Sequence, residues 1–226
     1  VASQRVGESV EAQLVLNTGV DPIYERWMGI GAITLVANQA VHHFHYYGTT
    51  EEDLALVAAK NYANALNNPY AHLQRHLTAE DALRTRMISW PLRLSDCCPS
   101  SDGACAVVFA SEERARRLTD RPAWVLGAGQ ITDNYWIAER PWYHDWDSLA
   151  MLARRVYKQA KIADPLAEID VAELYNAFTI NEIIQCEALG LCDKGKGPEL
   201  IRKDVTAIGG KLPICPSGGV LCSNPI

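Results

Sequence analysis

The stretch GGKLPICPSGGVLCSNPI at residues 209–226 decides how the rest of the sequence is interpreted. Glycine pairs and the turn Pro216-Ser217-Gly218-Gly219 surround a short apolar run at residues 220–222. Glycine and proline favour tight turns, so we expect residues 220–222 to form a strand that ends in a turn of small residues. Such a turn presents hydrogen-bond donors and often forms an active-site wall. Because the chain stops within this motif, we expect it to be the interior of a larger protein.

The composition excludes several classes of function. The 226 residues are 48% hydrophobic, enough for a core, and carry a net charge of −6 from 21 basic and 27 acidic residues. This acidic balance argues against nucleic acid as a partner. No apolar stretch reaches the roughly 20 residues that a membrane span needs. The seven cysteines are odd in number and scattered, which fits a reducing compartment and predicts a cytoplasmic location.

We expect neither a metal site nor a bound cofactor. The three clustered histidines, His42, His43 and His45, do not all share one face of the helix predicted there. Residues 127–129 form Gly-Ala-Gly, a partial dinucleotide fingerprint that lacks the third glycine. Neither pattern is specific enough to predict a ligand.

Strands alternate with helices along the sequence. Apolar and β-branched runs predict buried strands at residues 104–110, 123–129 and 169–174. Capping residues and apolar periodicity predict helices at residues 28–47, 51–67, 148–161 and 181–189. The alternation predicts an α/β fold with a largely buried sheet.

Three segments have an order and spacing that point to one family. They are SDCCPSSDGA at residues 95–104, ELYNAF at residues 173–178, and PSGG followed by SNP at residues 216–225. In this order they resemble the thiolase superfamily, specifically the sterol-carrier or lipid-transfer-protein type of thiolase. Residues 27–29, 48–55 and 187–197 resemble further parts of the family, so the similarity extends over nearly the whole chain.

The resemblance implies a duplicated α/β fold, an αβαβα layered sandwich with an inserted helical loop domain. Residues 1–122 would then be the latter part of the N-terminal half, with the loop domain at about residues 10–95. Residues 123–226 would be the first part of the C-terminal half. The two catalytic cysteines of the family fall in segments on either side of this chain. None of the seven cysteines is therefore assigned as the nucleophile.

The resemblance also implies two catalytic positions. Thiolases make or break a C–C bond beside a coenzyme A thioester carbonyl, which requires a base and donors for the developing oxyanion. Tyr175 and Asn224 stand where the family carries its Asn or His and its second His. Tyr175 can donate a hydrogen bond or act as an acid or base, whereas Asn224 can donate but cannot carry a proton near neutral pH. From the residues alone, a core tyrosine and a turn residue before proline are the simpler interpretations.

Five further residues are predicted to bind substrate. Cys98 and Ser100 correspond to the loop that thiolases lay against the pantetheine arm of coenzyme A, although an ordinary loop explains them equally well. Trp27 and Met28 correspond to a loop-domain pair beside the acyl-CoA, and surface packing is the alternative. Phe178 is expected to pack against the substrate channel or the core.

Three functions are compatible with these residues. The first is an acyltransferase-type enzyme with a coenzyme A thioester as substrate and no bound cofactor. The second is a retro-aldolase that shortens steroid side chains and works with an OB-fold/zinc-ribbon partner. Tyr175 fits this branch of the family, but Pro225, where the branch carries its second tyrosine, does not. The third is a subunit that binds acyl-CoA or lipid without catalysis. The resemblance further implies a homodimer or tetramer.

Overall fold

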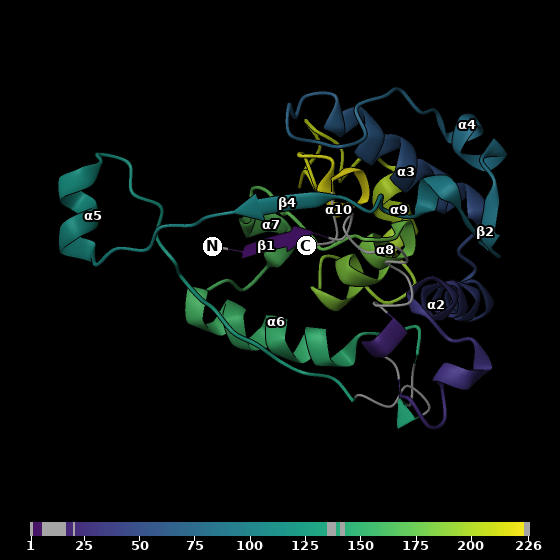
Figure 1. Cartoon of the computed structure of the whole chain (residues 1–226). Helices are drawn as coiled ribbons and strands as arrows, with labels where there is room; N and C mark the ends of the chain where they lie inside the picture. The colour runs from purple at the N-terminus through teal and green to yellow at the C-terminus, as the bar shows by residue number, and fades with distance from the viewer. Residues whose placement is uncertain (1, 6–16, 20, 135–138, 141–142, 224–226) are drawn as a thin grey trace.

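Helices dominate the part of the chain that the structure describes. This computed structural model describes residues 2–5, 17–19, 21–134, 139–140 and 143–223 (Figure 1). The α-helices are α2 (Ala32–Tyr47), α3 (Glu51–Ala65), α4 (Ala79–Arg84), α5 (Glu112–Leu118), α6 (Asp147–Ala160), α7 (Pro165–Glu168), α8 (Thr179–Ala188), α9 (Gly197–Arg202) and α10 (Gly219–Cys222). The 3-10 helices and strands are η2 (Asn17–Gly19), η3 (Arg26–Met28), η4 (Leu94–Asp96), β1 (Ala2–Arg5), β2 (Met87–Ser89), β3 (Leu92–Arg93) and β4 (Asp102–Cys105).

Local capping explains where several helices begin. At the start of α3, Thr50 Oγ1 accepts a hydrogen bond from Asp53 N, and Asp53 Oδ2 accepts one from Thr50 N. Thr78 and Asp81 form the same reciprocal pair at the start of α4. Each pair satisfies backbone N–H groups that the first helical turn leaves free. Gly48, with φ 74°, ends α2 in the left-handed conformation that glycine adopts without strain.

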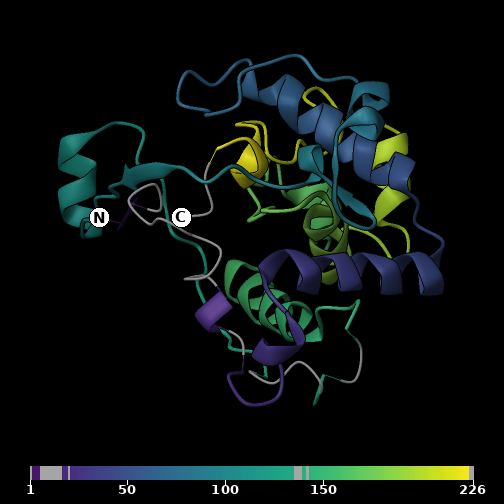
Figure 2. The same ribbon diagram turned by 45° about the vertical axis from the view of Figure 1, so that its right-hand side comes forward.

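The core is built around α8. Figure 2 shows α8 between α3 on one side and α2 and α6 on the other. Ile180, Ile183 and Ile184 of α8 are buried together with Leu54 of α3 and Val36 of α2. Burial of one such aliphatic side chain stabilises the fold by about 1.5–3 kcal/mol. This cluster fixes α8, and therefore the segment just before it, relative to α2 and α3.

The structure contradicts most of the predicted strands. β4 pairs with β1 in antiparallel register, Ala2 opposite Cys105, but the predicted strand at residues 104–110 loses its partner after Cys105. Residues 123–129 form no strand, and residues 169–174 contribute only an isolated bridge from Ala172 to Ile214. A strand forms only where a neighbour satisfies its N–H and C=O groups, and the described residues offer none there. The described part is mixed α/β, and the layered sandwich stays a prediction for the whole protein.

Residues 220–222 are also not a strand, because they belong to α10. Gly218 and Gly219 have φ values of 93° and 62°, and these conformations reverse the chain immediately before the helical turn. Asn176 Oδ1 accepts a hydrogen bond of 3.3 Å from Leu221 N. Leu221 and Cys222 are completely buried. A single turn of helix lets both side chains enter the core while the backbone bonds to Asn176.

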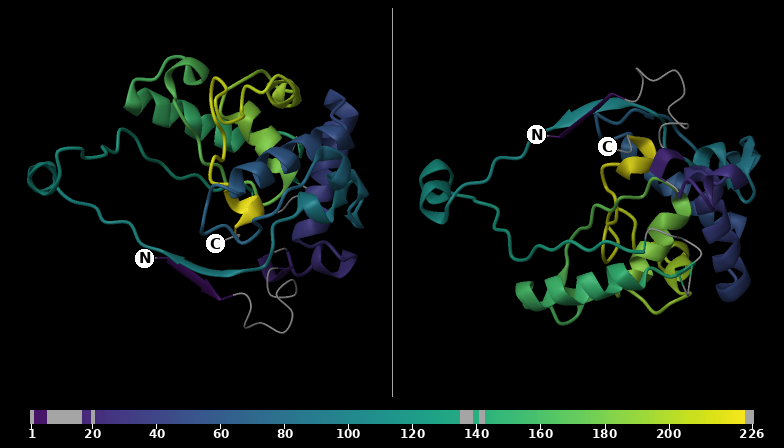
Figure 3. Two further views of the ribbon diagram at one scale, coloured as in Figure 1. Left: turned by 90° about the horizontal axis from the view of Figure 1, so that it is seen from above. Right: turned by 60° about the horizontal axis from the view of Figure 1, so that its bottom comes forward.

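The second half of the predicted strand at residues 104–110 belongs to a projecting segment. Figures 1 and 3 show α5 apart from the other helices, at the end of two extended stretches of chain. We call residues 106–126 the arm and the remaining described residues the body. The arm exposes a run of large apolar side chains: Val107, Val108, Phe109, Leu118, Trp124, Val125 and Leu126. Among the described residues, no helix has the length and apolar character to cross a membrane.

Candidate functional site

The segment Tyr175-Asn176-Ala177-Phe178 lies directly against the loop that contains Cys98. Cys98 N donates a hydrogen bond of 2.9 Å to Ala177 O, and Cys97 forms an antiparallel bridge with Phe178. These backbone contacts bring two of the three family-like segments side by side. The position of the tyrosine segment is therefore fixed at both ends, by the Cys98 loop and by the buried start of α8.

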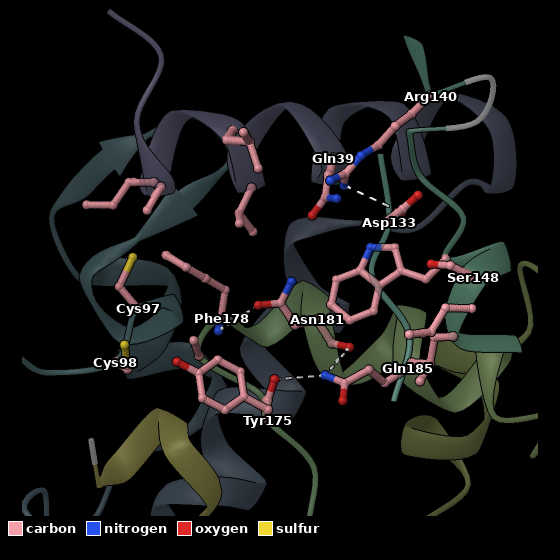
Figure 4. Close-up of a pocket in the computed structure, with 18 of the residues that line it drawn as sticks. Gln39, Cys97, Cys98, Asp133, Arg140, Ser148, Tyr175, Phe178, Asn181 and Gln185 are labelled. Carbon is pink, nitrogen blue, oxygen red and sulfur yellow. Dashed lines mark hydrogen bonds and ion pairs between the residues drawn. The ribbon is translucent and has the colours of Figure 1, made fainter. Parts of the chain in front are cut away.

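The two segments form one wall of a cavity of about 530 Å³. Figure 4 shows Tyr175 and Cys98 on one side of this cavity and Gln39, Asp133 and Arg140 on the other. Apolar side chains form much of the wall between them: Ile33, Leu35, Val36, Ile131, Trp146, Leu149 and Phe178. A cavity of this size, largely apolar with a few polar groups, is typical of a small-molecule site.

Four of the seven predicted site residues line this cavity: Tyr175, Cys98, Ser100 and Phe178. Trp27 and Met28 do not line it. They lie in η3, and their side chains are mostly exposed. Their predicted role therefore rests on the resemblance alone. Asn224 lies outside the described residues.

Tyr175 is the polar side chain best placed for chemistry in this wall. Its side chain is about half exposed, and partial burial raises the pKa of its phenol above the ordinary value of 10.0. The phenol is therefore protonated near neutral pH and can donate a hydrogen bond. Gln185 Nε2 donates a hydrogen bond of 2.9 Å to Tyr175 O and holds the backbone. Tyr175 also borders a shallower hollow, together with Ser217, Gly219 and Ser223.

Three cysteines, Cys97 and Cys98 in the cavity wall and the buried Cys222 of α10, are poor nucleophiles. Burial raises the pKa of Cys97 to about 12, that of Cys98 to about 11 and that of Cys222 to about 12. The thiolate is the nucleophilic form of cysteine, so these thiols are unreactive near neutral pH. That none of the seven cysteines is the catalytic nucleophile stays a prediction from the family resemblance. Cys98 contributes a small apolar surface and its backbone to the wall.

A buried polar network supports the tyrosine segment from behind. Glu182, which is fully buried in α8, accepts hydrogen bonds from Lys60 Nζ at 2.5 Å, Asn61 Nδ2 at 2.7 Å and Asn176 Nδ2 at 2.9 Å. Lys60 Nζ also donates to Ile214 O at 2.9 Å. The network joins α3, α8 and the residue next to Tyr175. A carboxylate buried in this way is stable only because each oxygen is paired.

Sequence reasoning did not identify this network or the cavity residues Gln39 and Asn181. A signal was present, because Asn181, Glu182 and Gln185 are polar residues in a helix that is buried from Thr179 to Glu187. Polar side chains in such a helix need partners, and a search for their partners would have singled them out.

The clustered histidines of α2 were not expected to bind a metal. Within the described ranges, no group of three or more His, Cys, Asp or Glu side chains is arranged to hold a metal ion. His43 is buried and has hydrogen-bond partners in Thr49 at 2.8 Å and Glu187 at 3.2 Å. These contacts give His43 a structural role.

The chain is similar to known proteins over most of its length. Residues 129–225 match the family described as Thiolase C-terminal domain-like. An acetyl-CoA acetyltransferase of Methanothermobacter thermautotrophicus is 35% identical over 96% of this chain and 56% of its own length. Sterol carrier protein 2 of Bos taurus is 33% identical over 83% of this chain and 35% of its own length.

A solved structure described as the Ltp2-ChsH2(DUF35) aldolase superposes with a TM-score of 0.75 and 33% identity. It covers 83% of this chain, which spans 50% of that structure. The chain thus corresponds to about half the length, or less, of the proteins it matches. The family match over residues 129–225 covers α6, α8, Tyr175 and the glycine-rich turn before α10. The chain belongs to the thiolase superfamily.

Proposed function

We propose that the protein acts on an acyl-CoA thioester and makes or breaks a C–C bond beside the thioester carbonyl, as an acyltransferase of the thiolase type. The observation that carries this proposal is the position of Tyr175, a protonated phenol in the wall of the 530 Å³ cavity beside the Cys98 loop. C–C bond cleavage at this position leaves an enolate on the thioester oxygen. A fixed donor stabilises that oxyanion.

In acyl transfer from a 3-ketoacyl-CoA, a nucleophile forms a bond to C3, the bond between C2 and C3 breaks, and its electron pair moves to C2 while the acyl group stays on the nucleophile. The C2 enolate takes up a proton and leaves as acetyl-CoA. The remaining acyl group passes to the sulfur of a second coenzyme A. Tyr175 would donate to the enolate oxygen or supply the proton to C2. The nucleophile for this reaction would come from outside the described residues.

A retro-aldol reaction is the second candidate, and Tyr175 itself favours it. In this reaction the 3-hydroxyl of a hydroxyacyl-CoA loses its proton, the C2–C3 bond breaks, and C3 becomes a carbonyl carbon. The C2 enolate is protonated as before, so no thiol nucleophile is needed. The similarity to a structure named as an aldolase supports this candidate. This candidate includes a partner protein with an OB fold and a zinc ribbon.

One assay separates the candidates. The full-length protein is given a 3-ketoacyl-CoA with free coenzyme A, or a 3-hydroxyacyl-CoA without it, and shortened thioester is measured. Product from the first substrate supports acyl transfer, and product from the second supports retro-aldol cleavage. Thioester binding without either product indicates a binding subunit and contradicts both.

Tyr175→Phe tests the role of the phenol. Loss of one oxyanion donor or general acid is expected to lower kcat about 100-fold or more, with little change in KM. The control is Tyr157→Phe in α6, because Tyr157 is also a partly buried tyrosine but donates its hydroxyl to Leu189 O at 2.8 Å, away from the cavity. Equal kcat values for Tyr175→Phe and the unmodified protein would overturn the assignment.

The whole protein is proposed to have the duplicated αβαβα architecture and to form a homodimer or tetramer in the cytoplasm. Size-exclusion chromatography with light scattering of the full-length protein tests the oligomeric state, and a monomer would contradict it.

A further inference from the structure

Gln39 is a buried polar side chain that has no hydrogen-bond partner among the described residues. It lies on α2 and is only 3% exposed. Its carboxamide makes no hydrogen bond with any residue in the described part of the chain, although Figure 4 shows it beside Asp133 and Arg140 at the far side of the cavity. Arg140 is already engaged, with Asp133 at 3.8 Å and with Asn134 O at 2.8 Å.

Asn181 is a second amide with free capacity in the same cavity. It is 5% exposed, and its Oδ1 accepts a hydrogen bond of 3.2 Å from Phe178 N. Its Nδ2 donates to no atom of the described residues. Figure 4 places Asn181 between Tyr175 and Gln39. Gln185, the third amide in this wall, uses its Nε2 for Tyr175 O and Asn181 O.

Gln39 makes no hydrogen bond within the described residues, and Asn181 uses only its Oδ1. Both residues line the cavity, so in a wall that is mainly apolar both have N–H donors available to a ligand. Two amide donors match one oxygen with free lone pairs. A purely hydrocarbon ligand would displace water from these amides and leave them unpaired, which penalises its binding.

We propose that Gln39 and Asn181 recognise an oxygen function, a hydroxyl or keto group, on the part of the acyl group that is remote from the thioester. The proposal rests on the proposed function, which places the thioester near Tyr175 and Cys98. The acyl group then extends along the apolar wall toward Asn181 and Gln39. The substrate class is an acyl-CoA with a largely apolar body and a polar oxygen at a defined distance from its carbonyl.

Equilibrium binding tests this inference independently of turnover. The full-length protein is titrated by calorimetry with decanoyl-CoA and with a series of decanoyl-CoA derivatives that carry one hydroxyl at successive carbons. The unmodified protein is expected to bind one position of the series at least about 10-fold more tightly than decanoyl-CoA, since a site with buried polar groups discriminates against a ligand that lacks the matching group.

Gln39→Met removes the carboxamide at nearly constant length, and it is expected to reduce this preference to less than about 3-fold. The matched control is Leu35→Met, because Leu35 lies one turn earlier on α2, lines the same cavity and receives the same new side chain. Leu35→Met should keep the preference. The melting temperature of Gln39→Met should equal or exceed that of the unmodified protein, because the lost amide has no partner.

The outcomes are separable. Equal affinity for decanoyl-CoA and all hydroxylated derivatives would overturn the recognition of oxygen and leave the proposed function intact. A preference that survives in Gln39→Met would exclude Gln39 as its source. If none of the thioesters binds, both the proposed function and this inference are overturned.

Discussion

Ile183 in the body and Val108 in the arm are similar residues in very different surroundings. Both are β-branched, yet Ile183 is 0% exposed and Val108 is 90% exposed. Ile183 belongs to α8, which satisfies its own backbone and packs against α2 and α3. Val108 follows β4 beyond the last residue that β1 pairs. The comparison shows that an apolar sequence predicts a need for burial but does not specify what covers it.

The largest effect that this comparison predicts is on solubility. The 226-residue chain produced by itself is expected to aggregate, because the arm exposes apolar side chains on unpaired backbone. Val108→Lys with Phe109→Lys should raise the monomeric fraction several-fold in size-exclusion chromatography. The control pair, Tyr70→Lys with Ile208→Lys, changes isolated exposed residues of the body and should not help. A monodisperse, cooperatively melting unmodified chain would contradict the prediction.

Glu182→Ala is expected to cause the next largest effect. It leaves the Lys60 ammonium group largely buried without its carboxylate, a change that lowers the free energy of unfolding by about 3–5 kcal/mol. In the arm, Glu112→Ala removes an exposed ion pair with Arg116 and should leave the urea midpoint unchanged. Similar midpoints for the two variants would show that the body does not depend on its buried network.

Asp96 makes the body sensitive to pH. Burial raises the pKa of its carboxyl to about 6, although Arg93 N and Thr179 Oγ1 donate hydrogen bonds to it at 2.8 Å. The folded state therefore binds this proton more tightly than the unfolded state, in which the pKa is about 3.9. The stabilising contribution is fully present below about pH 4 and is lost as the pH rises through 6, at most about 3 kcal/mol.

Urea unfolding of Asp96→Asn at pH 4 to 7 checks this expectation. The variant should lose the part of the pH dependence that falls in this window. The control Asp120→Asn replaces an exposed carboxylate of the arm and should retain it. An unchanged pH profile for Asp96→Asn would contradict the assignment.

The smallest expected difference between the body and the arm is the effect on stability of removing a helix-capping side chain. Thr50→Ala removes the side-chain acceptor at the start of α3 and should lower the free energy of unfolding by about 1 kcal/mol. Ser111→Ala removes the equivalent acceptor at the start of α5, where Ser111 Oγ receives Arg114 N. Because α5 lies in the arm, this change should not alter the unfolding midpoint. A matching loss in both variants would show that the arm and the body unfold together.

The same contrast explains what the sequence could predict of the fold. The starts of α3, α4 and α5 depend on side chains within three residues of the cap, so local sequence contains the whole signal. The predicted strands at residues 104–110 and 123–129 depend on a partner elsewhere in the chain, and local sequence says nothing about that partner. Residues 220–222 became helix for a related reason, since Asn176 binds the backbone of Leu221.

Some residues of the candidate site were identified from the sequence, and others were found only in the structure. Tyr175 and Cys98 were each assigned to the site because their segments resemble a family, and the structure places these two segments side by side. Lys60 and Glu182 are 122 positions apart in the sequence, and neither belongs to a short motif. Gln39 lies on a helix whose predicted bounds were nearly correct, but its lack of a partner is a property of the cavity and not of its sequence neighbours.

The close approach of Gly219 to Asn176 limits how this protein can evolve. A Cβ atom at residue 219 would lie 2.3 Å from Asn176 Oδ1, well inside the contact distance of the two atoms. A substitution of Gly219 by a residue with a side chain would therefore displace the Asn176 amide, which is adjacent to Tyr175. Positions 176 and 219 interact in this way although they are far apart in the sequence. Homologous sequences that retain Asn at position 176 should retain Gly at position 219, and those that lose one should have lost both.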